Sequence, residues 1–293
     1  MSLPSIGFIG LGAMGLPMAK LLVKAGYPLH TMIHQNQAPR EVLEPLGAEF
    51  HNRAAEIIQH SEVVITILPA DPQMESVLLS DETLSALKPN QTLIEMTSSS
   101  PQMMHKVEEV YRSKGVKVLD APVSGGTAGA QSGQLTVMAG GEAELLEDVR
   151  TILDVMAGKI IHVGKIGDGK AVKAINQMMA STHMLITAEA VALGEKLGVE
   201  MQALFDVIKE SSGASWMFVQ KYHALLEQQL EPGFKLKLMK KDLDIAVQEG
   251  AGIPLPLASS ALQWYEAASR AHGEMDFAAV SRLIRDTAAG NEA

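Results

Sequence analysis

Three glycines near the start of the chain have the spacing that binds a phosphate group. The segment Gly10-x-Gly12-x-x-Gly15 follows a short apolar run and precedes a helical pattern. In such a unit the first glycine makes a tight turn, the second lets the backbone approach a pyrophosphate, and the third lets helix and strand pack closely. The free N–H groups at the helix start then face the phosphates. We expect a dinucleotide to bind here, through residues Gly10, Leu11, Gly12, Ala13, Met14 and Gly15.

The residues about twenty positions further on bear on which dinucleotide binds. A carboxylate there would hold the ribose 2′-hydroxyl of NAD and repel the 2′-phosphate of NADP. The sequence instead reads Thr-Met-Ile-His34-Gln35-Asn36, with Arg40 close by, and has no acid. These side chains could donate to a phosphate, or they could be ordinary loop residues. We expect NADP or NAD as cofactor, with NADP favoured and His34 in contact with it.

A lysine and two amides share one side of a long helical pattern. Lys173, Asn176 and Gln177 have the spacing i, i+3, i+4, and their neighbours are mostly apolar. Such a polar stripe either faces solvent or lines a site. An ammonium beside a carbonyl that is being reduced would stabilise the developing negative charge and could donate the proton. In the oxidation direction a neutral lysine would accept the hydroxyl proton, for which burial would have to lower its pKa.

A second glycine-rich turn follows a strand pattern in the middle of the chain. Ser124 offers a hydroxyl, and the backbone N–H groups of Gly125 and Gly126 can converge on an anion. The same residues would also make a plain turn.

The elements that carry these residues change in kind along the chain. Up to about residue 164, strand patterns alternate with helical ones, which predicts a mostly parallel sheet with helices on both faces. Beyond it, only helical patterns separated by turn residues follow. We therefore expect an α/β fold, a doubly wound Rossmann domain at 1–164 and an all-α domain at 165–293. The predicted strands are Ser5–Ile9, Leu29–Ile33, Val63–Leu68, Thr92–Met96, Val116–Leu119, Leu135–Ala139 and Ile160–Val163. The predicted helices include Ala13–Ala25, Arg53–Gln59, Pro101–Lys114, Ala143–Met156, Asp168–Leu197, Met201–Ser211, Ser215–Gln228, Leu236–Glu249, Pro256–His272 and Asp276–Ala289.

Composition excludes several classes of partner. The formal net charge of −10 disfavours nucleic acid. The absence of cysteine removes disulfides and thiolate chemistry and fits a cytoplasmic location. No apolar stretch is long and uninterrupted enough for a membrane helix, and the nine histidines form no evident metal motif, so we expect neither a membrane partner nor a metal.

The chain resembles the β-hydroxyacid dehydrogenase family, which includes 3-hydroxyisobutyrate dehydrogenase and tartronate semialdehyde reductase. The similarity begins in Gly7–Ala19 and continues through Thr66–Pro69, Glu95–Ser98, Asp120–Gly126, Gly167–Gln177 and Lys241–Leu243. These segments follow the family's order and span most of the chain. The chain departs from the family pattern at Leu21, where asparagine is common, and in the missing acid near His34.

The resemblance implies that the protein interconverts a small 3-hydroxy acid and its carbonyl partner, bound between the two domains, with Lys173 as the catalytic residue. It implies that Ser124, Gly125 and Gly126 bind the substrate carboxylate, that Asn176 and Gln177 bind substrate or hold the lysine, and that the family is dimeric or tetrameric. Near the cofactor it places residues Leu68, Pro69, Ser98 and Lys241.

Two other functions remain open: a non-catalytic dinucleotide-binding protein, and an imine reductase of related fold. Lys173 speaks against both. The substrate itself is open as well. The segment Gly213–Phe218 is similar to one in family members acting on four-carbon sugar acids such as threonate, although Trp216 and Phe218 could equally be packing residues.

Overall fold

The structure is a computed structural model that describes residues 3–34 and 36–288. The chain divides into two compact units, Met1–Lys173 and Ala174–Ala293. This division lies nine residues beyond the boundary that the change in sequence pattern predicts, because the first turns of a long helix belong to the first unit.

The first unit is built on one nine-stranded sheet. Along its path the strand order is β3-β2-β1-β4-β5-β6-β8-β7, and β9 also pairs with β8. Pairing is parallel from β3 to β6, and β8 enters antiparallel to β6 and β7. From β1 the strand order runs in one direction through β2 and β3, and in the other direction from β4 to β6. The switch point therefore lies between β1 and β4, and ligands of such sheets bind at the carboxyl ends of the strands that border it. The strands are β1 Ile6–Ile9, β2 Leu29–Met32, β3 Glu49–His51, β4 Val63–Thr66, β5 Thr92–Glu95, β6 Lys117–Asp120, β7 Val123–Ser124, β8 Leu135–Gly140 and β9 Ala157–Gly164.

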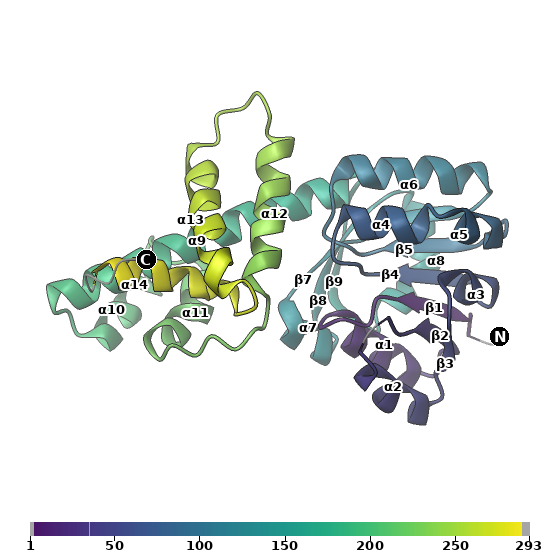
Figure 1. The fold of residues 1–293 in the computed structure, drawn as a ribbon, viewed down its shortest axis with the longest axis horizontal. Helices are drawn as coiled ribbons and strands as arrows, with labels where there is room; N and C mark the ends of the chain where they lie inside the picture. Colours follow the sequence, from purple (N-terminus) through teal and green to yellow (C-terminus); the bar gives the residue numbers. More distant parts are fainter. Residues whose placement is uncertain (1–2, 35, 289–293) are drawn as a thin grey trace. The chain divides into compact units, whose positions relative to one another are not determined.

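Helices cover both faces of this sheet (Figure 1). Successive residues of a strand point to opposite faces, so Ile65 packs in one core with α1, α2, α7 and α8, while Val64 packs in the other with α3, α4, α5 and α6. The helices are α1 Gly15–Lys24, α2 Ala38–Leu43, α3 Ala54–Gln59, α4 Asp71–Leu78, α5 Asp81–Ala86, α6 Pro101–Ser113, α7 Gly126–Ser132 and α8 Ala143–Leu153, with a 3-10 turn Glu44–Leu46 after α2.

The predicted Rossmann sheet followed by helices is confirmed. The strand patterns did not reveal β3 or β7, which have only three and two residues. The predicted helices also did not include α2, α4, α5 and α7, each of which has eight residues or fewer.

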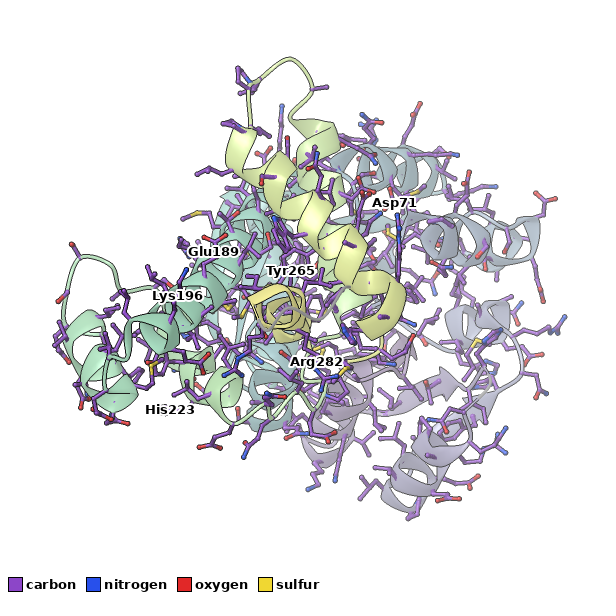
Figure 2. The ribbon with its side chains drawn as sticks, turned by 60° about the vertical axis from the view of Figure 1, so that its left-hand side comes forward. Asp71, Glu189, Lys196, His223, Tyr265 and Arg282 are labelled. Atoms are coloured by element: carbon purple, nitrogen blue, oxygen red, sulfur yellow. The ribbon has the colours of Figure 1, made fainter. Side chains whose placement is uncertain are left out.

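The second unit contains helices alone apart from one isolated bridge between Lys235 and Asp276, within the described residues. Its core includes Tyr222 and Tyr265, both with no solvent exposure, and the position of Tyr265 is marked in Figure 2. No helix of the described chain combines the length and the apolar character that crossing a bilayer needs. The helices are α9 Asp168–Leu197, whose first six residues belong to the first unit, α10 Met201–Ile208, α11 Trp216–Leu226, α12 Leu236–Glu249, α13 Pro256–His272 and α14 Val280–Ala288, with a 3-10 turn Phe277–Ala279.

Candidate active site

The glycine loop has the geometry that its spacing predicts. Gly10 has a φ of +110°, and a Cβ added to it would lie 2.1 Å from the carbonyl oxygen of Ile67. A Cβ on Gly15 would lie 1.8 Å from the carbonyl oxygen of Gly10. Only a glycine at position 15 therefore allows helix α1 to pack this closely against the turn. At Gly12 no described residue other than its chain neighbours has an atom within 4 Å of the Cβ position. The space beside Gly12 is therefore open to a group that approaches the backbone, as a pyrophosphate does.

The end of β2 carries the residues that bear on cofactor choice. His34 is exposed, Gln35 lies outside the described residues, and Asn36 Oδ1 accepts a hydrogen bond from the N–H of Ala38 at 3.0 Å. The guanidinium of Arg40 lies over the ring of Phe50, 4.9 Å from its centroid. Its Nε is buried without a hydrogen-bond partner among the described residues. A buried N–H donor of this kind is suited to an anionic ligand.

The loops after β4 and β5 are fixed to each other. The N–H of Leu68 donates to Thr97 Oγ1 at 2.8 Å, one residue before Ser98. Asp71, labelled in Figure 2, accepts from the N–H of Ser100 at 3.0 Å and from its hydroxyl at 2.5 Å. These bonds hold the segments that contain Leu68, Pro69 and Ser98 at the carboxyl end of the sheet.

The turn after β7 exposes its backbone. Gly125 and Gly126 are exposed and have φ values of +130° and +61°, and Ser124 is half-buried. Both glycines therefore adopt conformations that L-residues rarely take. The turn presents N–H groups and a hydroxyl at the same end of the sheet as the other loops.

A buried ion triplet that the sequence analysis missed joins helix α9 to the sheet. Lys170 Nζ lies 2.5 Å from Oε2 of Glu95 and 3.0 Å from Oδ1 of Asp120, and none of the three side chains is exposed. Glu95 and Asp120 are the last residues of β5 and β6. Burial acts to lower the pKa of Lys170, but the two carboxylates outweigh it and raise the pKa above its ordinary value.

Backbone hydrogen bonds complete this junction. The second oxygen of Asp120 accepts from the N–H groups of Gly167 and Lys170, both at 3.1 Å. The first turn of α9 is thereby fixed against the carboxyl ends of β5 and β6. Lys173 follows Lys170 by three residues, a little less than one helical turn, and is only 7% exposed. The predicted catalytic lysine is thus a buried residue on an anchored helix, not a solvated one.

In the second unit, the predicted residues Gln177 and Lys241 both contact Asp242, which was not predicted. Gln177 Nε2 donates to Oδ2 of Asp242 at 2.7 Å, and Lys241 Nζ lies 2.7 Å from the other oxygen. Asn176 Nδ2 donates to the side-chain oxygen Oε1 of Gln177 at 3.1 Å. The buried carboxylate of Asp242 therefore orients both Gln177 and Lys241.

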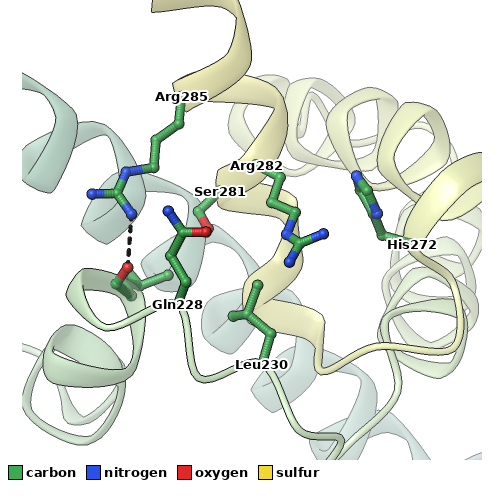
Figure 3. A pocket seen from close by; sticks show the side chains of 7 residues that line it. Gln228, Leu230, His272, Ser281, Arg282 and Arg285 are labelled. Atoms are coloured by element: carbon green, nitrogen blue, oxygen red, sulfur yellow. Dashed lines mark hydrogen bonds between the residues drawn. The ribbon is translucent and has the colours of Figure 1, made fainter. Parts of the chain in front are cut away.

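The second unit also contains a pocket of about 290 Å³ that holds none of the predicted site residues (Figure 3). The guanidinium of Arg285 is already engaged there, with the carbonyl oxygen of Leu225 at 3.0 Å and with Glu195. We assign no role in the reaction to this pocket, since the glycine loop and Lys173 lie elsewhere in the chain. Its lining residues are Leu225, Gln228, Leu230, His272, Ser281, Arg282 and Arg285.

The triplet does leave a signal in the sequence. Every residue of β5 is buried, and so are the last three of β6, yet both strands end in a carboxylate. A charge inside an otherwise apolar strand needs a partner of opposite sign. Lys170, in the segment already identified at 167–177, was a candidate for that partner.

Comparison with known proteins covers both units. The family described as the NAD binding domain of 6-phosphogluconate dehydrogenase matches residues 5–164. The family described as the NAD-binding domain of NADP-dependent 3-hydroxyisobutyrate dehydrogenase matches residues 167–284.

Several relatives that align over nearly the whole chain are dehydrogenases named for a hydroxy acid. The chain is 36% identical to an NAD-dependent L-serine dehydrogenase of Pseudomonas aeruginosa, over 96% of this chain and 98% of the relative. It is 34% identical to an L-threonate dehydrogenase of Cupriavidus necator, over 96% of each chain. A solved structure of Mycobacterium tuberculosis 3-hydroxyisobutyrate dehydrogenase with L-serine is similar with a TM-score of 0.89, at 34% identity, over 97% of this chain and 99% of that one.

Proposed function

This chain belongs to the β-hydroxyacid dehydrogenase family, and we propose that Lys173 is the acid–base group with which it interconverts a small 3-hydroxy acid and its semialdehyde. The protein is an NAD(P)-dependent hydroxy acid dehydrogenase. The observation that carries the proposal for Lys173 is its burial on the turn of α9 that Lys170 anchors to the sheet. Ionisable side chains that are held out of water at a ligand-binding edge are candidates for catalytic groups, because such surroundings tune their proton affinity.

The division of labour follows from the chemistry. The nicotinamide, when bound, accepts or donates the hydride. Lys173 takes the hydroxyl proton during oxidation, and it returns a proton to the oxygen during reduction. In the reduction its ammonium also stabilises the negative charge that develops on that oxygen. No metal is required for this proton transfer.

The remaining predicted residues hold the two reactants. We propose that the hydroxyl of Ser124 and the N–H groups of Gly125 and Gly126 bind the substrate carboxylate, because this turn exposes its donors. We propose that residues 10–15 with Leu68, Pro69 and Ser98 bind the nucleotide, and that Lys241 reaches it. Asp242 then acts by holding Gln177 and Lys241 in place.

For the cofactor we propose NADP over NAD. The support is a buried guanidinium Nε at Arg40 that lacks a partner among the described residues, and a β2 end without a carboxylate. A guanidinium suits a phosphate because it offers several donors in one plane. Arg40→Met should raise the dissociation constant for NADP at least about tenfold and leave that for NAD near the wild-type value. Equal loss for both nucleotides would refute the proposal.

For the substrate we propose a hydroxy acid of three or four carbons. Phe218 is 3% exposed and stacks with Phe205 at 5.7 Å between centroids, so it is a packing residue. Of the two aromatic residues in that segment, Trp216, 65% exposed at the start of α11, is the one still open to a ligand. The similarity to an L-threonate dehydrogenase is the second support.

The test is a spectrophotometric assay of nicotinamide reduction with L-threonate, 3-hydroxyisobutyrate and L-serine, each with NADP and with NAD. We expect turnover of at least one acid with NADP as the better cofactor. Trp216→Ala should alter KM for a four-carbon acid more than for L-serine. Nucleotide binding without turnover of any hydroxy acid, or of any corresponding semialdehyde in the reverse direction, would refute the proposed reaction and favour the binding-only alternative.

We also propose that the protein is a homodimer or homotetramer assembled through α9. Within the second unit, one side of this helix exposes apolar side chains at spacings of four and seven, each more than half exposed: Ile175, Met179, Ile186, Leu193 and Leu197. A second copy would remove such a face from water. Ile186→Glu should shift the mass measured by light scattering towards the monomer, and a monomeric wild type would refute assembly. The cytoplasmic location stays a prediction that cell fractionation tests.

A further inference from the structure

Three histidines and a glutamate lie close together where strands β2 and β3 meet the end of helix α3. His30 lies on β2, Glu49 and His51 lie on β3, and His60 ends α3. The three ring centroids are 5.0 to 5.5 Å apart. None of these residues takes part in the function proposed above, and their positions in the sequence show no metal-binding spacing.

The ligand atoms have the separations that one metal ion requires. His30 Nδ1 lies 3.1 Å from His51 Nε2 and 3.5 Å from Oε2 of Glu49. All three atoms fall within 4.8 Å of one another. Two ligand atoms that each lie about 2.1 Å from a tetrahedral ion are about 3.4 Å apart. The two measured separations therefore lie on either side of the value expected for neighbouring ligands of zinc.

The third histidine of the cluster, His60, holds its ring against His51. His60 Nδ1 lies 2.7 Å from the carbonyl oxygen of Glu56, which requires a proton on Nδ1. This bond fixes the His60 ring, which stacks on His51 with an angle of 22° between planes.

We propose that His30 Nδ1, His51 Nε2 and the Glu49 carboxylate form a binding site for a divalent transition-metal ion of the zinc class. Two imidazoles and one carboxylate favour such an ion over Mg²⁺ or Ca²⁺, which take oxygen ligands. Water completes the coordination on the open side, where Glu49 is 70% exposed. The ion fastens the edge strand β3 to β2 by its side chains, in addition to the backbone ladder that pairs His30 with Glu49.

The test uses full-length protein with its affinity tag removed and its metal stripped by a chelator. We titrate Zn²⁺ by calorimetry and Co²⁺ by visible absorption. We expect about one equivalent per chain and the strong absorption of four-coordinate Co²⁺. His30→Gln and His51→Gln should each weaken binding by more than about 100-fold, since loss of even an outer partner of a ligand costs 10- to 100-fold. The matched control is His105→Gln, on an exposed histidine of α6.

Two further measurements keep the outcome decisive. Glu49→Gln changes an exposed side chain, so the variant should fold and should bind Zn²⁺ at least about tenfold more weakly. Zn²⁺ should raise the melting temperature of the wild type, and a chelator should reverse the rise. Absence of stoichiometric binding, or equal losses in His51→Gln and His105→Gln, would overturn the site. Nicotinamide turnover is independent of this result, so failure here leaves the dehydrogenase proposal standing.

Discussion

The ammonium of Lys170 lies 2.5 Å from the carboxylate of Glu95 in a place that no solvent reaches. Asp120 contacts the same ammonium, so one cation faces the carboxyl groups of two residues. Because Glu95 and Asp120 end neighbouring strands, this contact fixes where α9 begins relative to the sheet. The position of Lys173 depends on that anchoring.

Lys170→Met should destabilise the nucleotide-binding unit strongly. The change leaves two buried carboxylates without a cation, which costs about 3–5 kcal/mol of unfolding free energy for a broken buried pair. Urea denaturation at neutral pH measures this loss.

Lys165→Met is the matched control, because its side chain is exposed five residues upstream. Its unfolding curve should overlay that of the wild type. If Lys170→Met were as stable as Lys165→Met, the triplet would have no structural role.

The glycine loop predicts opposite results for two similar changes. Gly12→Ala adds a methyl group where no described residue beyond its chain neighbours lies within 4 Å, so the melting temperature should not change while nucleotide affinity falls at least about tenfold. Gly15→Ala places a methyl group 1.8 Å from a carbonyl oxygen, so the melting temperature of that variant should fall. Thermal unfolding and fluorescence titration with NADPH separate the two. Unchanged affinity in Gly12→Ala would mean that the pyrophosphate lies elsewhere.

Lys173→Ala should abolish turnover and spare nucleotide binding. Loss of a general acid–base group typically lowers kcat by about 10²–10⁴-fold. Stopped-flow measurement of a single turnover reports the chemical step, and a titration reports binding. Lys196→Ala, at an exposed lysine of the same helix, should behave as the wild type. Substantial activity in Lys173→Ala would remove this residue from the mechanism.

The stability of the metal-free protein should fall in mildly acidic solution because of His30. Its pKa in the folded state is lower than the ordinary value of 6.5, so the unfolded chain takes up the proton first. The stabilising contribution is therefore present above pH 6.5 and is lost as the pH falls through the folded value. The groups that face His30 are Glu49 and His51 from β3 and His60 from α3.

Melting temperatures between about pH 8 and pH 5 measure this effect. His30→Gln should show a shallower acid decline, while His105→Gln should follow the wild type. An equal decline in all three proteins would contradict the assignment to His30.

Long elements were predictable from their hydrophobic pattern. Helix α9 has the predicted limits, as do α12 and α13, because apolar residues recur over many turns. Strand β3 has only three residues, none of them buried, and it forms because β2 offers an open edge. No pattern of its own marks it.

The geometry of the candidate site was predictable where a local segment determines it. The turn at Gly10 and the helix start at Gly15 follow from residues adjacent in the chain. Groups assembled across the sheet were not predictable in this way. Lys170 meets carboxylates 50 and 75 residues earlier, and His30 meets His51 only because β2 and β3 pair in one particular register.

The burial of Lys170 limits how the chain can be divided into independently folding pieces. The NAD-binding family ends its match at residue 164, before the cation that neutralises Glu95 and Asp120. A fragment cut there would have to expose, protonate or hydrate two carboxylates that the whole chain seals from water. The ammonium that neutralises these carboxylates is therefore supplied by helix α9, whose remaining residues belong to the second unit. A fragment for expressing the nucleotide-binding unit alone should extend through Lys173.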